Sequence, residues 1–198
     1  IPDSVQGNPA VGMDAKGNFV VVWQEGISYT QIMARVFTAD GNPRANAFHV
    51  SHPAGADIHA FSCFYPEVAV FPDGKFTVFW SKHAGSPVNV TEAQQFDAEG
   101  GALTDIFRVD EAGKFTDISD YISVAAYPPG GLTAFVWSGN ESGDYNIFTR
   151  FCNASGVFSI PSASVNDRPG QQYFPDVAMD DVGNTLVAWH DNRNGNFD

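Results

Sequence analysis

A tryptophan recurs four times along the chain at nearly constant spacing, and this repeat limits the folds that the sequence can adopt. In each copy a valine precedes the tryptophan by 12 or 13 residues, and a glycine turn lies between the two. The copies are "PAVGMDAKGNFVVVWQE" (9–25, Val11 to Trp23), "PEVAVFPDGKFTVFWSK" (66–82, Val68 to Trp80), "ISVAAYPPGGLTAFVWSG" (122–139, Val124 to Trp137) and "PDVAMDDVGNTLVAWHD" (175–191, Val177 to Trp189). The four valines are separated by 57, 56 and 53 residues, so the chain is a repeat protein with a period of about 55 residues.

Each copy continues into a second pair of predicted strands. The segments are "IMARVFTADGNPRANAFHVS" (32–51), "VTEAQQFDAEGGALTDIFRVD" (90–110) and "NIFTRFCNASGVFSIPSASVN" (146–166). Their turns place Asp or Asn before Gly, which is the local chemistry that permits a positive φ. No helical periodicity competes with this pattern, so one repeat is predicted to be four short antiparallel strands.

The second strand of each repeat indicates how the sheets are arranged. Both "FVVVW" (19–23) and "TLVAW" (185–189) are apolar at every position, so we expect both faces of the sheet to be covered. Four-stranded sheets that repeat at this period and pack on both sides are typical of a β-propeller, which makes the fold class all-β. The predicted architecture is one propeller region, 1–198, of four-stranded antiparallel blades, with repeats at approximately 6–62, 63–118, 119–171 and 172–198.

The last predicted repeat stops after its second strand. We therefore expect the chain to be part of a larger propeller, or to be completed by a partner chain. An open blade edge also favours self-association.

The repeat resembles blades found in large secreted and cell-surface proteins of bacteria and archaea, in which W-x-D-x-R-x-G-x-x-D leads into the third strand. The segment "WHDNRNGNFD" (189–198) matches this motif closely, and "WSGNESGDYNIF" (137–148) matches it more loosely. The resemblance covers essentially the whole chain and implies a propeller in an extracellular or cell-surface setting. Its motifs are structural, so it does not imply a reaction. The segment "FPDGKFTVFW" (71–80) matches the sialidase Asp-box motif only in part, and the arginine triad of sialidases cannot be placed in the sequence.

Charge excludes several classes of partner. The chain has 10 Lys and Arg against 23 Asp and Glu, a net charge of −13, so a phosphate backbone or an anionic membrane would repel it. No apolar run is long enough for a membrane span, and membrane insertion is not expected. The acidity suits solubility, with calcium binding as the alternative.

Two cysteines, Cys63 and Cys152, are predicted to be buried thiols, and the alternative is a disulfide between adjacent blades.

Candidate ligand-binding residues are expected where the connections between strands vary. In a propeller, the loops that follow the second and the fourth strands share one face, and here those loops differ in length and composition. Tyr65, Tyr121 and Tyr173 recur near the start of the first strands. They either pack between blades or line the channel mouth and stack on a sugar ring or an aromatic side chain. His190, Asp191 and Arg193 are candidates on the same face.

Two loops contain residues that could bind a metal ion. The loop 109–121 contains Asp110, Asp117 and Asp120, which are candidate calcium ligands, although the EF-hand spacing is absent. The segment "HVSHPAGADIH" (49–59) contains three histidines and an aspartate, but His49 is expected to point away from the others. Ordinary solvated loops are the alternative for both. Calcium is thus the one cofactor suggested, and none is certain.

No catalytic residues are assigned, because nucleophile-elbow, zinc-protease, C-x-x-C and phosphate-loop motifs are all absent. The favoured function is a non-catalytic extracellular module for protein or glycan binding, adhesion or self-assembly, and a structural spacer is a further option. The alternative is a polysaccharide-acting hydrolase or lyase with acidic residues over the central channel. Carboxylates about 5 to 10 Å apart there would favour the enzyme.

Overall fold

The computed structural model describes residues 4–52, 57, 59–83, 89–127, 129, 131–141, 143–166, 169–193 and 195, and of Asp120 only the backbone. These residues form strands and no helix. Within the described part of the chain, no helix is available that could span a membrane.

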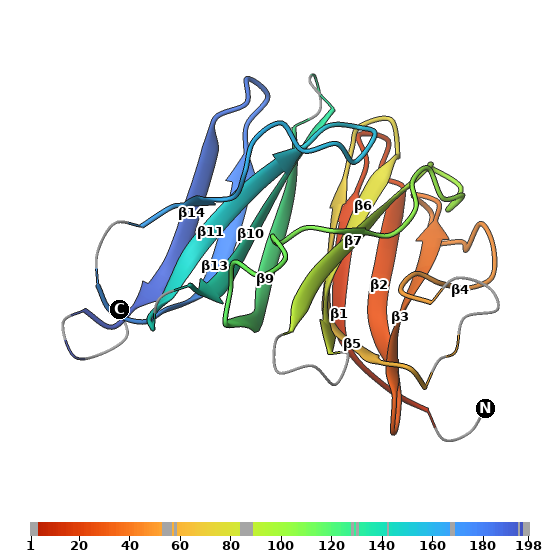
Figure 1. The fold of residues 1–198 in the computed structure, drawn as a ribbon. Coiled ribbons are helices and arrows are strands. Elements are labelled where there is room, and N and C mark those ends of the chain that lie inside the picture. Colours follow the sequence, from red (N-terminus) through yellow and green to blue (C-terminus); the bar gives the residue numbers. More distant parts are fainter. Residues whose placement is uncertain are drawn as a thin grey trace.

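The strands form four antiparallel sheets in chain order (Figure 1). Sheet A contains β1 (Val5–Met13), β2 (Phe19–Gly26), β3 (Thr30–Phe37) and β4 (Phe48–His49). Sheet B contains β5 (Ser62–Val70), β6 (Phe76–His83), β7 (Val90–Phe96) and β8 (Phe107–Arg108). Sheet C contains β9 (Asp117–Tyr127), β10 (Leu132–Asn140), β11 (Tyr145–Cys152) and β12 (Ala163–Ser164), and sheet D contains β13 (Gln172–Met179) and β14 (Thr185–Asp191).

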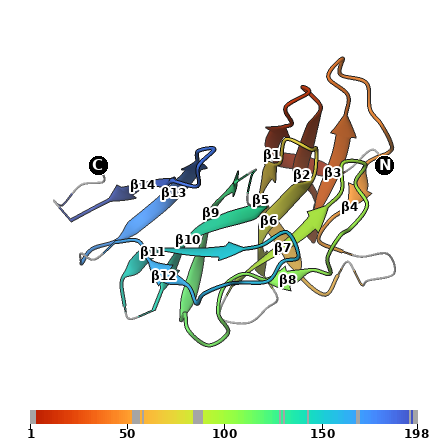
Figure 2. The same ribbon diagram turned by 90° about the horizontal axis from the view of Figure 1, so that it is seen from above.

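The sheets follow one another around an arc. Figure 2 shows the first strand of each sheet on the inner side of the arc, and the fourth strands of sheets A, B and C on the outer side. Within each sheet, consecutive strands pair with each other. The predicted all-β fold with four-stranded antiparallel propeller blades is confirmed.

Aspartate side chains fix the turns between the first and second strands. The Asp14 carboxylate accepts hydrogen bonds from the backbone N–H of Lys16 (2.8 Å) and Asn18 (2.9 Å). Asp180 accepts the corresponding bonds in sheet D, and the glycine of this turn, Gly183, has φ 89°. The D-x-x-G pattern in the sequence therefore forms these turns by local hydrogen bonding, and its carboxylates are structural.

A second repeated contact holds the third strand. A side-chain oxygen just after the fourth strand accepts a hydrogen bond from a backbone N–H of the third strand. The pairs are Ser51 with Ile32 (2.9 Å), Asp110 with Thr91 (2.7 Å) and Asn166 with Ile147 (2.8 Å). These oxygens occupy the same place in three sheets, so we assign them a structural role. They hold the end of the fourth strand against the third strand.

The hydrophobic core consists of the interfaces between sheets, and each interface pairs the same two surfaces. We call the surface of a sheet that carries its repeat tryptophan the Trp face, and the other surface the back face. The back face of one sheet packs on the Trp face of the next. The residues are Val20 and Val22 against Val78 and Trp80, Ala69 and Phe79 against Phe135 and Trp137, and Ala134 and Val136 against Val187 and Trp189.

Burial on both faces is observed for the middle sheets only. The strands β6 and β10 are buried at nearly every position. In β2 and β14, burial alternates instead, and Leu186 is 72% exposed. The prediction that "FVVVW" and "TLVAW" are covered on both faces is therefore wrong for this structure, because sheets A and D each pack against a single neighbouring sheet.

Both cysteines lie in these interfaces as free, buried thiols, so the alternative of a Cys63–Cys152 disulfide is wrong. Cys63 belongs to the interface between sheets A and B, and Cys152 to the interface between sheets B and C. Burial raises the pKa of each thiol to about 12, which makes them packing residues without nucleophilic character.

Candidate functional site

The first strands share an irregularity near their beginning. Their pairing with the second strands shifts register between Gly7 and Ala10, between Phe64 and Glu67, and between Tyr173 and Asp176, and β9 shifts opposite Trp137 and Gly139. Such bulges redirect side chains and are common beside functional sites. The repeated bulge therefore identifies the inner side of the arc as the place where side chains are specially oriented.

The residue at the centre of the bulge is aromatic in three sheets. Tyr65, Tyr121 and Phe174 each lie three positions before the valine of the repeat, and Asn8 occupies this position in sheet A. The φ angles of Asn8, Tyr65 and Phe174 are 45°, 51° and 54°, in the left-handed region that bulky residues avoid. The rings are nevertheless exposed, at 40% for Tyr65, 39% for Tyr121 and 46% for Phe174.

Tyr121 and Phe174, together with Tyr173 and a histidine, form a continuous surface across sheets C and D. The ring centroids of Tyr121 and Phe174 are 3.7 Å apart, and Tyr173 lies 6.3 Å from Tyr121. His190 lies 5.1 Å from Phe174. We call this group, together with Tyr65 of sheet B, the aromatic surface. It brings together Tyr121, Tyr173 and His190 from the predicted set and adds Phe174, which the sequence reasoning missed.

Polar side chains lie two positions further along the same strands, immediately before the repeat valine. They are Glu67 in β5, Ser123 in β9 and Asp176 in β13. The hydroxyl Oγ of Ser123 donates a hydrogen bond to Oδ1 of Asp176 at 2.9 Å. This hydrogen bond connects sheets C and D on the inner side of the arc.

Glu67 has a strongly perturbed carboxyl group. Burial, and then the negative charge of Asp176, raise the pKa of Glu67 to about 7. A carboxyl with this pKa holds a proton near neutral pH and can also release it. Glu67 is therefore a carboxyl group that can donate a proton, and its charge interaction with Asp176 shows that a second carboxyl group lies in its surroundings.

The remaining ligand candidates, Asp191 and Arg193, pair with each other. Arg193 Nε lies 2.9 Å from Asp191 Oδ2, and the Arg193 backbone N–H donates to Asp191 Oδ1 at 2.8 Å. Asp191 is buried, so its carboxylate holds the turn after β14. Of the three predicted residues His190, Asp191 and Arg193, only His190 belongs to the aromatic surface.

Two of the predicted calcium residues, Asp110 and Asp117, bond to other side chains or backbone groups in the structure. Asp110 is buried, and its carboxylate accepts hydrogen bonds from Thr91 and from Arg108 Nε (2.8 Å). Asp117 accepts a hydrogen bond from the Tyr145 hydroxyl, and the side chain of Asp120 lies outside the described residues. The described part of the chain contains no group of three or more His, Cys, Asp and Glu side chains placed to hold a metal ion. Calcium binding at this loop stays a prediction.

The histidine segment does not form a cluster either. His52 is buried with its ring stacked on Phe61 at 4.3 Å. His59 contacts the edge of Tyr29 at 5.0 Å, and His49 is exposed on β4. These contacts are those of packing residues.

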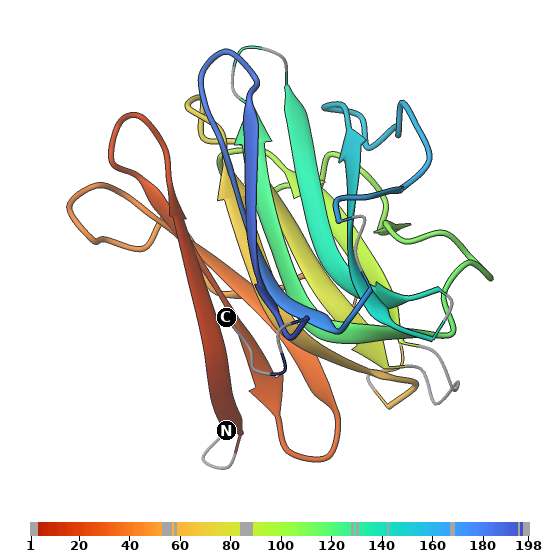
Figure 3. The ribbon, with the colours of Figure 1, turned by 90° about the vertical axis from the view of Figure 1, so that its left-hand side faces the viewer.

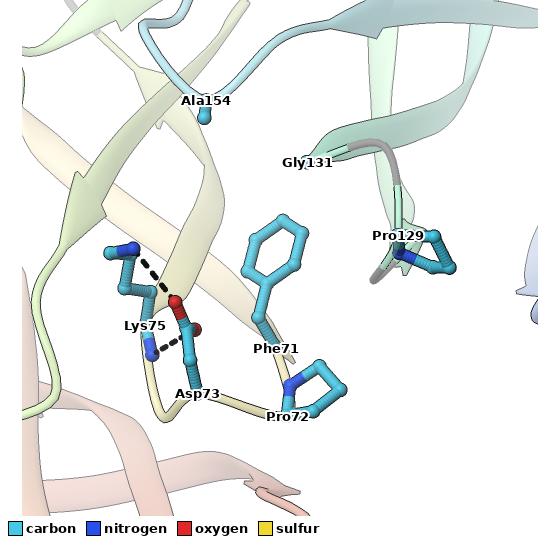
Figure 4. A pocket seen from close by; sticks show the side chains of 7 residues that line it. All are labelled: Phe71, Pro72, Asp73, Lys75, Pro129, Gly131 and Ala154. Atoms are coloured by element: carbon cyan, nitrogen blue, oxygen red, sulfur yellow. Dashed lines mark hydrogen bonds and ion pairs between the residues drawn. The ribbon is translucent and has the colours of Figure 1, made fainter.

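A hollow of about 500 Å³ lies at the opposite end of the strands from the bulges, between the turns of sheets B and C (Figure 4). Its lining is mainly apolar, with Phe71, Pro72 and Pro129. The charged pair in the lining, Lys75 and Asp73, is 2.7 Å apart and is mutually neutralised. This hollow offers less polar chemistry than the inner side of the arc.

Comparisons with known proteins show the fold and no more. No protein-family model and no curated protein matches the chain. Among solved structures, a Hadza microbial sialidase is similar with a TM-score of 0.68 and 11% identity, over 96% of this chain and 42% of the sialidase. An endo-arabinase from Bacteroides thetaiotaomicron has a TM-score of 0.58 and 12% identity, over 96% of this chain and 71% of that one.

A third structure, the native Bacillus subtilis arabinanase, has a TM-score of 0.53 and 12% identity, over 99% of this chain and 72% of the arabinanase. The chain therefore spans less than half of the sialidase and about seven tenths of the two arabinan-degrading enzymes. These similarities establish the β-propeller fold. The activities of the named proteins belong to those proteins.

Proposed function

We propose that the chain binds a neutral glycan on the aromatic surface. One observation carries this proposal: bulky aromatic side chains are held exposed at equivalent bulges, two of them at a positive φ that favours Asn or Gly. Flat, exposed rings stack on the apolar face of a sugar. Glu67 and Asp176 lie two positions after Tyr65 and Phe174 on the same strands, and their carboxyl groups could hydrogen-bond to sugar hydroxyls.

The sugar is expected to be uncharged. The polar groups beside the rings include two acidic side chains, and the whole chain has a net charge of −13, so an anionic sugar would be repelled. Glycan-acting enzymes among the structures of similar fold support a glycan ligand in general terms. A glycan-binding module of this kind suits an extracellular or cell-surface protein that takes part in adhesion.

Binding to a panel of neutral polysaccharides (arabinan, galactan and mannan) tests the proposal, with polygalacturonate as the anionic comparison. We expect Tyr121→Ala and Phe174→Ala each to weaken binding about fivefold, which corresponds to roughly 1 kcal/mol for one lost stacking contact. Tyr29→Ala is the matched control, because Tyr29 is also exposed but lies outside the aromatic surface. Unchanged binding in both test variants would refute the proposal.

A second candidate function is glycoside hydrolysis, and the pKa of Glu67 favours it. Glu67 would protonate the leaving oxygen, and Asp176 would act as the base or the nucleophile. Release of reducing sugar from a bound polysaccharide would support the enzyme if Glu67→Gln and Asp176→Asn abolish release and retain binding. Binding without any product would leave the non-catalytic module as the function.

A further inference from the structure

The bulge of sheet B has one backbone N–H group that needs an acceptor. The pairing of β5 with β6 shifts register between Phe64 and Glu67, so Tyr65 and Pro66 fall outside the regular ladder. A bulge leaves its extra residue without a ladder partner. Pro66 has no N–H, so the N–H of Tyr65 is the only backbone donor of these two residues. The group that accepts this N–H helps to fix the backbone from which the Tyr65 ring projects.

A side chain of the neighbouring sheet accepts this N–H. The Tyr65 nitrogen donates a hydrogen bond to Oε1 of Gln24 at 3.2 Å. Gln24 follows Trp23 on β2 and lies on the back face of sheet A, in one row with Val20 and Val22. That face packs on sheet B, and the red strands of sheet A lie next to the yellow strands of sheet B in Figure 3. The hydrogen bond therefore joins two sheets that pack on each other.

Asn8 orients the same oxygen. Asn8 Nδ2 donates a hydrogen bond to Gln24 Oε1 at 2.7 Å, so both partners of this oxygen are donors. Asn8 occupies the bulge position of sheet A, where sheets B, C and D have aromatic residues. The contact accounts for this departure from the repeat, because an aromatic ring in place of Asn8 would bring no amide group to Gln24.

The position after the repeat tryptophan makes a related contact in another interface. Ser138 follows Trp137, and its hydroxyl donates a hydrogen bond to the backbone oxygen of Gln172 at 2.6 Å. Gln172 begins β13, two residues before Phe174. In both interfaces the side chain at this position reaches the bulged end of the next first strand, and Gln24 bonds to the bulge residue itself.

We propose that Gln24, oriented by Asn8, is a positioning residue that holds Tyr65 in place on the aromatic surface, a role that rests on the glycan binding proposed for that surface. Neither side chain needs to touch the sugar, because both act on the backbone of Tyr65. Both contacts use the acceptor oxygen of Gln24. A carboxylate at this position should therefore replace the amide, whereas a side chain of the same length without a strong acceptor should not.

Hydrogen exchange of the Tyr65 amide, measured by NMR without any sugar, tests the contact itself. We expect Gln24→Met to raise the exchange rate about threefold or more, because one neutral hydrogen bond is lost. Gln24→Glu should leave the rate near the wild-type value. Gln6→Met is the matched control, since Gln6 is an exposed glutamine that bonds to Glu25 within sheet A. An unchanged Tyr65 rate in Gln24→Met would overturn the proposal, whatever the protein binds.

Asn8→Asp tests the orienting role of Asn8. Aspartate tolerates the left-handed backbone at this position (φ 45°) and, when ionised, presents only acceptor atoms. The Gln24 amide must then turn its nitrogen towards the new carboxylate, which takes the acceptor away from the Tyr65 N–H. We expect the Tyr65 amide to exchange about as fast as in Gln24→Met. A wild-type rate in Asn8→Asp would refute the role of Asn8.

Affinity for the neutral polysaccharide that the wild type binds most tightly connects the contact with the aromatic surface. We expect Gln24→Met to weaken binding about threefold and Gln24→Glu to bind as the wild type does. In a Tyr65→Ala background, Gln24→Met should have no further effect, because Gln24 acts through Tyr65. A loss that persists in that background would overturn the positioning role. If no polysaccharide binds, the proposed function fails, and the exchange rates still decide whether Gln24 holds Tyr65.

Discussion

Glu67 should make the stability of the protein depend on pH, and Glu67→Gln should remove that dependence. The pKa of this carboxyl is raised from 4.5 to about 7 by burial and then by the charge of Asp176. A group with a higher pKa in the folded state holds its proton more tightly there. Its contribution to stability is complete below about pH 4.5 and is lost as the pH rises to about 7.

The size of the effect follows from the pKa difference. The change from 4.5 to about 7 is about 2.5, which corresponds to at most about 3.4 kcal/mol in the free energy of unfolding. Glu67 is only partly buried, so solvent screening reduces the expected loss to roughly 1 to 2 kcal/mol. Glutamine has nearly the same shape as glutamate and cannot ionise, so Glu67→Gln should avoid the loss.

Urea unfolding followed by tryptophan fluorescence measures this at several pH values. Relative to the wild type, Glu67→Gln should be nearly neutral at about pH 5 and more stable by roughly 1 to 2 kcal/mol at about pH 8. Glu141→Gln, at an exposed position, is the control and should show no such trend. The reasoning is refuted if Glu67→Gln is not stabilised at high pH, or is stabilised equally at both.

Three further outcomes are expected. Trp137→Ala should lower the free energy of unfolding by about 3 to 5 kcal/mol and Trp23→Ala clearly less, since Trp137 is fully buried and Trp23 is half-buried; equal losses in urea unfolding would contradict this. Asp110→Ala should cost about 1 to 3 kcal/mol by leaving the buried N–H and hydroxyl of Thr91 without their acceptor, and a neutral variant would contradict it. Cys63 and Cys152 should react with a thiol reagent only after unfolding, and rapid reaction of the native protein would contradict their burial.

The blades could be predicted from the sequence because their determinants are local and repeated. A valine, a glycine turn and a tryptophan at fixed spacing specify two adjacent strands, and Asp14 and Asp180 form the turns within four residues of themselves. Such contacts are visible in a linear pattern. They led directly to the antiparallel sheets that the structure contains.

Coverage of the sheets was less predictable. The sequence "TLVAW" shows that the side chains on both faces of β14 are apolar. Apolar character alone does not tell whether another sheet packs on each face. In the structure Val187 packs on sheet C, while Leu186 on the other side is exposed. The difference depends on the number of sheets that are packed together, which one strand does not encode.

The candidate site could also be predicted only in part from the sequence. Tyr65 and Tyr121 stood out because aromatic residues recur at one position, whereas Glu67 and Asp176 are separated by two repeats and have Ser123 at the position between them. Their proximity arises from the packing of first strands around the arc. Asp110 illustrates the same limit: acidic residues in a loop suggest a metal site, whereas the hydrogen bonds from Arg108 and Thr91 to its carboxylate are visible only in the fold.

Comparison of the four bulges bears most directly on function. Asn8 shows that the same left-handed backbone is compatible with a residue that tolerates it, so the fold does not require a bulky side chain there. At Tyr65 and Phe174 a positive φ costs on the order of 1 to 3 kcal/mol each. Burial offsets this cost only in part, because Tyr65 and Phe174 stay 40% and 46% exposed. A ligand that presents a flat apolar surface, such as the sugar proposed above, would add contacts to the exposed part of each ring and help to offset the cost.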